Sequence, residues 1–502
     1  MARVQTLFSN PVLTGDRVNC EGYPAFSRSW QEQYVQLLLT NTMSNTFYMD
    51  ETSLMLHSQE LHEAALNEDV CFAAKAMIYA RNQGFMRLQP IFGLSLLSNG
   101  YPNLFKRVFP YIIQTPADLS DFLYILSSAK RGQGGRAVKT MAAQYLNRLS
   151  EYHAIKYKGK GLAFPLADML RTIHPKPVNN KQSALFAYLR AKGTPDLSEL
   201  PQVAAVRQLH TAHSEAEQIA AIAAGRLPHN LVTGAVKMTP AIWEALLPDM
   251  PLFALLRHLA TLERNNIVDN HRELIENRLA DETSLRRAKI LPFRLAQAYQ
   301  SINNAWIKDA LRNAVEKSIV NLPELEGSVA ILLDISGSME GQYLVSGALF
   351  ALGLYKQSGG KAKFLLFDTA VYDPQPSLCD SILTQAERIK SGGGTDTGVA
   401  LKYLRQQKWN IDTIVLITDE QQNSGSPFYK ELTSYRKTVN RYAKAVIIDL
   451  TPYDAAMTPP DDEQTYYCYG WSDAALTFTA NVTRGYGSLI EEIHAIQLET
   501  NE

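Results

Sequence analysis

From about residue 30 to residue 320, apolar residues recur at the three- and four-residue intervals that are typical of amphipathic helices. In the helix predicted at 117–128, one face is formed by Leu119, Phe122, Leu123 and Leu126. A second apolar stripe runs through 135–150, and a further helix is expected from Ala241, after Thr239 as its cap and Pro240 in its first turn. Many helices with short polar connectors, no strand pattern and no clean fixed-period repeat predict an α-solenoid or a related helical array.

The pattern changes after Pro323. Strand-like runs and helical runs then alternate, and the expected strands are 328–334, 362–367, 413–419 and 444–450. The helices expected between and after them are 341–356, 380–390, 397–407 and 428–442. This alternation predicts a doubly wound parallel sheet covered by helices on both faces. We therefore expect a helical domain at 1–324 and an α/β domain at 325–502, an α + α/β architecture.

The composition is that of a globular protein, with 46% hydrophobic and 20% charged residues. Its four cysteines have neither metal-site nor disulfide spacing, which favours a reducing compartment. The first residues show no signal-peptide pattern, and no stretch has the ~20 apolar residues of a membrane span. We expect a cytoplasmic protein without a membrane partner.

The formal net charge of −1 hides an asymmetry along the chain. Residues 326–502 contain 14 Lys and Arg against 22 Asp and Glu, whereas residues 101–192 contain 15 basic against 4 acidic residues. A local basic excess of this size favours binding to a polyanion, nucleic acid above all, although a solvated charged surface is the alternative.

Three basic clusters lie within this region. A Gly-rich turn and the helix after it contribute Lys130, Arg131, Arg136 and Lys139, and a turn with an aromatic neighbour contributes Lys156 and Lys158. A helix end with a proline-stiffened loop contributes Arg171, His174 and Lys176. Each cluster alone also fits an ordinary solvated connector or helix end. Together they predict an RNA-binding surface that holds phosphate through Arg and Lys and weakens steeply with salt.

A different chemistry is indicated in the last third of the chain. Asp334, Ser336 and Ser338 follow one expected strand, Thr395 lies on a Gly-rich loop, and Asp419 ends another strand. Side chains from such loops meet at the carboxyl edge of a parallel sheet. Asp334-x-Ser336-x-Ser338 alone also fits a strand-to-helix turn with capping residues. The five oxygen-bearing residues together predict a site for a hard divalent cation, Mg²⁺ or else Mn²⁺.

This five-residue set resembles the metal-ion-dependent adhesion site of von Willebrand factor A domains. A long helical module joined to such a domain resembles the Ro autoantigen family, whose helical module is called TROVE. Three stretches are similar to that family: Asp168–Arg171 with His174, Lys176 and Pro177; Trp243–Arg257; and Arg287–Phe293 with Ala298 and Tyr299.

The Ro resemblance implies a ring of HEAT-like helical repeats that binds small noncoding Y-like RNA and the single-stranded ends of misfolded RNA. It also implies a ribonucleoprotein for RNA quality control, with a 3′ exonuclease, polynucleotide phosphorylase, as a partner through an RNA tether. By motif match, the resemblance assigns RNA binding to Arg171, His174 and Lys176. We expect a noncatalytic protein, because the sequence has no Ser-His-Asp order, P-loop or His/Cys metal set. We also expect a monomer. The alternative is a metal-dependent protein-interaction module with a helical protein-binding solenoid.

Overall fold

The computed structural model describes residues 15–41, 50–128, 134–158, 161–191, 196–288, 290, 292–320, 325–451, 453, 455–470, 473–485 and 489–498. Contacts between residues divide the chain into two compact units. The sheet unit consists of residues 1–61 and 319–494, and the helical unit consists of residues 62–318 and 495–502. The change from helices to strands lies where the sequence places it, near 325, but the amino-terminal segment groups with the sheet.

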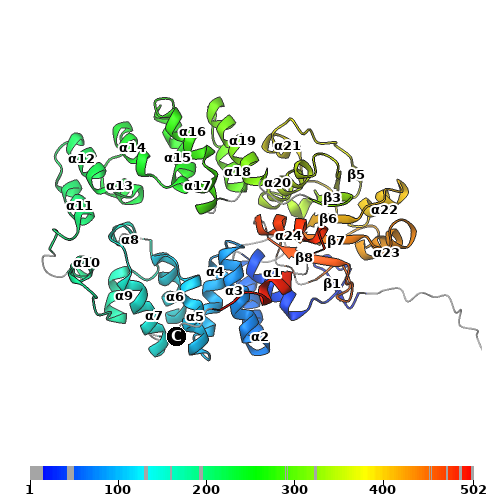
Figure 1. The fold of residues 1–502 in the computed structure, drawn as a ribbon, viewed down its shortest axis with the longest axis horizontal. Coiled ribbons are helices and arrows are strands. Elements are labelled where there is room, and N and C mark those ends of the chain that lie inside the picture. The colour runs from blue at the N-terminus through cyan, green and yellow to red at the C-terminus, as the bar shows by residue number, and fades with distance from the viewer. Residues whose placement is uncertain are drawn as a thin grey trace, which may run out of the picture. The chain divides into compact units, whose positions relative to one another are not determined.

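The helical unit is an array of short helices (Figure 1). After α2 (Glu51–Glu68), which crosses the boundary between the units, the array continues with α3 (Val70–Asn82), α4 (Leu88–Leu97), α5 (Pro102–Ile112), α6 (Pro116–Ser128), α7 (Gly135–Asn147), α8 (Glu151–Tyr157), α9 (Leu166–Ile173) and α10 (Asn180–Arg190). It is completed by α11 (Pro201–Thr211), α12 (Glu215–Gly225), α13 (His229–Ala235), α14 (Pro240–Leu246), α15 (Leu252–Arg264), α16 (Arg272–Ala280), α17 (Glu282–Arg287), α18 (Pro292–Gln300) and α19 (Ala305–Val320). Helices one or two apart in the chain pack together, as α3 does with α4 and α5. The predicted helical array is confirmed.

Local sequence explains where these helices begin and end. The predicted helix at 117–128 is α6, whose apolar face is buried. Thr239 accepts a hydrogen bond from the Ile242 amide and caps α14, as expected. The stripe at 135–150 is interrupted, because Ser150 caps a new helix, α8, through the His153 amide.

A six-stranded sheet organises the other unit, in the order β5-β4-β3-β6-β7-β8. The four predicted strands are β3 (Val329–Asp334), β4 (Lys363–Phe367), β6 (Thr413–Thr418) and β7 (Lys444–Asp449), all parallel. The sequence prediction missed β8 (Thr465–Tyr469), which is parallel to β7, and the two-residue edge strand β5 (Val371–Tyr372), which is antiparallel. The sheet is therefore mixed at one edge.

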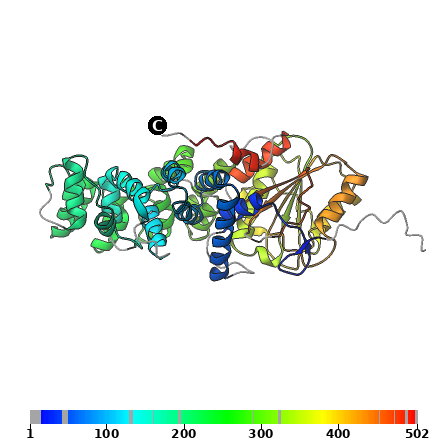
Figure 2. The same cartoon turned by 90° about the horizontal axis from the view of Figure 1, so that it is seen from below.

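Helices cover both faces of this sheet, as the alternation predicted. They are α20 (Gln342–Gln357), α21 (Ile382–Arg388), α22 (Val399–Gln406), α23 (Phe428–Thr438), α24 (Asp473–Thr483) and α25 (Leu489–His494). On β3, Ala330 and Leu332 belong to one core cluster with α22 and α23, whereas Leu333 lies against Gly347 of α20. Figure 2 shows α23, in orange, on one side of the sheet. The apolar runs of β3 and β6 are buried throughout, as strands covered on both faces must be.

The amino-terminal segment, residues 15–41, packs onto the sheet unit. It contains β1 (Arg17–Val18), β2 (Pro24–Ala25) and α1 (Trp30–Thr40). Phe26 forms an isolated antiparallel bridge with Ala456, and its ring lies edge-on to Tyr429. Helix α1 packs against β8. This segment therefore forms part of the α/β unit although more than 280 residues separate it from β3.

Candidate metal centre and nucleic-acid interface

The first element of the candidate metal centre is the end of β3. Asp334 is fully buried, and its two carboxylate oxygens accept hydrogen bonds from the Ser336 amide at 2.8 Å and from the Thr418 hydroxyl at 2.6 Å. Burial and the neighbouring Asp368 raise the pKa of Asp334, while these hydrogen bonds lower it. Ser336 and Ser338 are also buried, and their hydroxyl oxygens lie 3.4 Å apart. The carboxylate and both hydroxyls are thus gathered in one turn.

Two further loops close around this turn. The Gly-rich loop is joined to it by the bonds Gly392 N–Ile335 O and Gly337 N–Gly393 O. Thr395 in that loop is buried, and its amide donates to the Asn423 side chain at 2.8 Å. Asn423 belongs to the loop that begins at Asp419. The structure therefore brings the three predicted loops together at the carboxyl ends of β3 and β6.

Asp419 is the second buried carboxylate of the candidate metal centre. Its carboxylate is buried, and the Oδ2 atom has no hydrogen-bond partner among the described residues. Burial and the nearby Asp334 raise the pKa of Asp419 to about 7. A divalent cation would neutralise this pair and satisfy the orphaned oxygen. The described residues contain no group of three or more His, Cys, Asp or Glu side chains that could hold a metal ion. The donors gathered at this site are two carboxylates with hydroxyls, a set that would suit Mg²⁺ or Mn²⁺.

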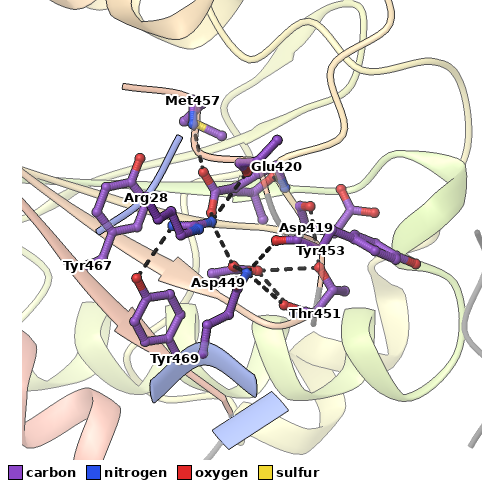
Figure 3. A network of polar contacts seen from close by, with 12 residues as sticks. Arg28, Asp419, Glu420, Asp449, Thr451, Tyr453, Met457, Tyr467 and Tyr469 are labelled. Carbon is purple, nitrogen blue, oxygen red and sulfur yellow. Dashed lines mark hydrogen bonds and ion pairs between the residues drawn. The ribbon is translucent and has the colours of Figure 1, made fainter. Parts of the chain in front are cut away.

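The sequence prediction missed the amino-terminal contacts to the Asp419 loop. Arg28 is buried and forms ion pairs with Glu420 and with Asp449, the latter at 3.1 Å (Figure 3). Its guanidinium lies over the rings of Tyr467 and Tyr469, 4.7 and 5.4 Å from their centroids. Burial and Glu420 raise the pKa of Asp449 well above its ordinary value, and Arg28 opposes that rise.

Three consecutive residues after Asp419 are held by this segment. Besides Glu420, the Gln421 side chain accepts from the Cys20 amide at 2.9 Å, and the Gln422 carbonyl accepts from Asn19 at 2.7 Å. Gln422 also accepts from the Thr397 hydroxyl at 2.7 Å. No local motif signals the contacts of Asn19 and Cys20 with this loop, because the partners lie 403 and 401 residues apart in the chain.

The predicted RNA-binding residues lie on α7, α8 and α9 and on the connectors that follow them. Lys130 and Arg131 fall outside the described residues. Arg136 and Lys139 are exposed on α7, and Arg171, His174 and Lys176 are exposed at and after the end of α9. His174 is the carboxyl-terminal cap of α9 in the left-handed conformation, with φ of 54°. Arg171 forms a 2.7 Å ion pair with exposed Asp168.

The second cluster lies against aromatic rings, with Lys156 half-buried and Lys158 exposed. Lys158 lies 3.5 Å from the centroid of Tyr188 in α10, and Lys156 lies 5.4 Å from that of Tyr157. Burial lowers the pKa of both lysines. Because α10 packs against α8 and α9, and α7 packs against α9, the described clusters come from one group of contacting helices.

Sequence reasoning missed a cavity beside the first cluster. It has a volume of about 730 Å³ and is lined by residues of α5, α7 and α8, among them Arg107, Arg148 and His153. No Asp or Glu occurs among its described lining residues. In the part of the chain that the structure describes, no helix has the length and apolar character needed to cross a bilayer.

Two family models each match part of the chain. A TROVE domain model matches residues 232–324, and a model described as a VWA domain containing CoxE-like protein matches residues 323–463. The protein thus combines a TROVE segment with a von Willebrand A-type domain. Both were expected from the sequence.

Two relatives and one solved structure are similar to this chain over different lengths. An RNA-binding protein RO60 of Deinococcus radiodurans is 23% identical over 93% of this chain and 95% of its own length. An RNA-binding protein RO60 of Caenorhabditis elegans is 26% identical over 44% of this chain and 38% of its own length. The crystal structure of the Deinococcus radiodurans RO (RSR) protein matches with a TM-score of 0.67 and 19% identity, over 91% of this chain and 100% of that one. These findings confirm the predicted fold class and the predicted resemblance to the Ro family.

Proposed function

We propose that this protein is a noncatalytic RNA-binding scaffold that holds small noncoding RNA and the single-stranded ends of misfolded or damaged RNA for quality control. The observation that carries the proposal is the likeness, along 93% of the chain, to a protein named for RNA binding. The exposed cations of α7 and of the α9 connector supply the phosphate-binding groups that such a role needs.

Crosslinking in the native cells tests this function. RNA recovered with the wild-type protein is sequenced and compared with RNA recovered with the triple variant Arg171→Ala, His174→Ala, Lys176→Ala. We expect a short structured RNA or damaged noncoding transcripts with the wild type and their loss in the variant. Background RNA in both samples would contradict the RNA role and favour the protein-binding solenoid.

The proposal extends to the cation site. Asp334, Ser336, Ser338, Thr395 and Asp419 would hold Mg²⁺ or Mn²⁺, and the bound cation would supply an open electrophilic position for an acidic side chain of a partner protein. The protein's own residues gather the donors, bury them from water and fix their loops through Thr418, Asn423 and the amino-terminal segment. A 3′ exonuclease joined through an RNA tether, and a monomeric state, are the further parts of this proposal that follow from the family resemblance.

Metal binding should appear as a gain in thermal stability. At a metal concentration about 100 times Kd, a ligand that binds only the folded state adds about 2.7 kcal/mol. We expect Mg²⁺ or Mn²⁺ to raise the Tm of the wild type and of Asp373→Asn, an exposed carboxylate in the same unit, but not of Asp419→Asn. Calorimetric titration should agree. An equal response of all three proteins, or no binding to the wild type, would refute the site.

A further inference from the structure

The residue after Asp419 has a backbone conformation that its own side chain does not favour. Glu420 has a φ of 60°, in the left-handed region that glycine enters freely and glutamate rarely does. Such a conformation persists only where surrounding contacts hold it. One carboxylate oxygen of Glu420 pairs with Arg28, and the other accepts from the Met457 amide at 2.9 Å. The direction in which the chain leaves Asp419 therefore depends on contacts from outside its loop.

A chain of hydrogen bonds continues from Glu420 to the first carboxylate of the candidate metal centre. The Glu420 amide donates to the Thr418 hydroxyl at 3.0 Å, and that hydroxyl donates in turn to Asp334 at 2.6 Å. A change in the backbone at Glu420 would withdraw the amide that orients this hydroxyl. Arg28, which belongs to the amino-terminal segment, thus acts on Asp334 through two intervening residues.

The second ion-pair partner of Arg28 leads to Asp419 itself (Figure 3). Asp449 accepts a hydrogen bond from the Thr451 amide at 3.0 Å, and the Thr451 hydroxyl donates to the Asp419 carbonyl at 3.3 Å. All four side chains are buried, so the contacts form in a medium where they are stronger than in water. One guanidinium is therefore connected to both carboxylates of the candidate metal centre.

The beginning of the amino-terminal segment holds the next two residues of the loop. The Cys20 amide donates to the Gln421 side chain, whose Nε2 donates to the Asp419 carbonyl at 3.2 Å. The Asn19 side chain donates to the Gln422 carbonyl at 2.7 Å. Gln421 is fully buried, and Asn19 and Gln422 are nearly so. The amino-terminal segment thus fixes three consecutive residues after Asp419.

We propose that the amino-terminal segment is a latch that sets the cation affinity of the candidate metal centre, with Arg28 and Asn19 as its positioning residues. The inference rests on the proposed function, because it takes Asp334 and Asp419 to hold the cation. Contacts that orient metal ligands from outside typically change metal affinity about 10–100-fold. By thermodynamic linkage, cation binding must strengthen the attachment of the segment by the same factor that attachment strengthens cation binding.

Calorimetric titration of the full-length protein with Mn²⁺ tests the first half of this coupling. The variants are Arg28→Met and Asn19→Ser, measured at a temperature where circular dichroism shows them folded. Serine keeps an oxygen that can accept from the amides of the turn after residue 19, but it is too short to reach the Gln422 carbonyl. We expect the Kd to rise about tenfold in Arg28→Met and by a smaller factor in Asn19→Ser. If Arg28→Met fails to fold, Asn19→Ser decides.

The matched control is Arg436→Met, which separates coupling from a general loss of stability. Arg436 forms a half-buried ion pair with Asp462 at 2.7 Å in the same unit. It also donates to the carbonyls of Ala443 and Gln464, which precede β7 and β8 at the edge of the sheet opposite to Asp419. Its loss removes a comparable ion pair away from the Asp419 loop. The control should bind Mn²⁺ with the wild-type Kd.

Hydrogen exchange followed by mass spectrometry tests the reciprocal half. Peptides from residues 15–28 are compared in the presence and absence of saturating Mn²⁺. In the wild type, we expect the cation to slow exchange of these amides about tenfold, the factor by which attachment raises affinity. In Asp419→Asn, Mn²⁺ should leave the exchange of the segment unchanged. A segment that only stabilises the fold would not respond to the cation.

The possible outcomes distinguish the latch from the cation site. Equal Kd values in the wild type, both segment variants and the control, with segment exchange unaffected by Mn²⁺, would overturn the latch and leave the cation site standing. A rise in Kd in Arg436→Met as large as in Arg28→Met would also overturn it, because lost stability would then be the cause. Absence of Mn²⁺ binding to the wild type would refute the cation site, and the latch with it.

Discussion

Replacing Arg28 with methionine should destabilise the sheet unit by about 3–5 kcal/mol, the usual cost of removing one partner from a buried ion pair. The change leaves Glu420 and Asp449 buried without their cation. It also removes the guanidinium from its position over Tyr467. Denaturant unfolding followed by circular dichroism measures the loss. The control is Arg388→Met, whose ion pair with Asp380 is exposed and worth about 0–1 kcal/mol.

The pH dependence of the Arg28→Met variant should identify the cause. Arg28 opposes the rise in the pKa of Asp449, so its removal should raise that pKa further. A carboxyl group whose pKa is raised in the folded state lowers the free energy of unfolding at high pH. This loss becomes smaller as the pH falls below the raised pKa, and it is gone below the ordinary pKa of the group. The variant should therefore regain stability relative to the wild type as the pH is lowered. The double variant Arg28→Met, Glu420→Gln should be more stable than Arg28→Met alone at neutral pH. A loss that is independent of pH and unchanged by Glu420→Gln would contradict this explanation.

Neutralising four exposed cations of the helical unit should weaken RNA binding about 10²–10³-fold, at roughly 1 kcal/mol for each lost phosphate contact. The variant replaces Arg136, Lys139, Arg171 and Lys176 with glutamine, and all four side chains are exposed. The salt slope of the affinity should fall by about 0.7–0.9 for each contact removed. Anisotropy with a small structured RNA over a salt series measures both quantities.

Net charge alone must be excluded as the cause of that loss. The matched control replaces four exposed lysines of the sheet unit with glutamine, and these are Lys390, Lys402, Lys430 and Lys437. Both variants have the same formal net charge, so only the position of the lost cations differs. We expect the control to keep nearly wild-type affinity. Equal losses in the two variants would indicate nonspecific attraction and contradict a defined binding surface.

The sequence predicted that the loops carrying Asp334, Thr395 and Asp419 meet, because the signals for this are local. Asp334 and Asp419 each end a continuous apolar run, and such runs become buried parallel strands whose carboxyl ends share an edge. Helix α6 could also be predicted from the sequence, because its apolar residues are regularly spaced, and the structure buries that apolar face.

Contacts between distant segments were not predictable. Arg28 gives no local signal of its pairing with Glu420, which lies 392 residues away. Which residues of α15 and α18 face each other depends on how the two helices pack, which helical periodicity does not determine. The short edge strand β5 was also missed, because two residues are too few for a recognisable alternation.

Mapping the protein peptides that crosslink to RNA tests the central claim most directly. Ultraviolet crosslinking of the full-length wild-type protein to its native RNA, followed by proteolysis and mass spectrometry, identifies the contacting residues. The account predicts crosslinked peptides from the helical unit, concentrated between residues 135 and 176. Crosslinks confined to the sheet unit, residues 325–494, would contradict it.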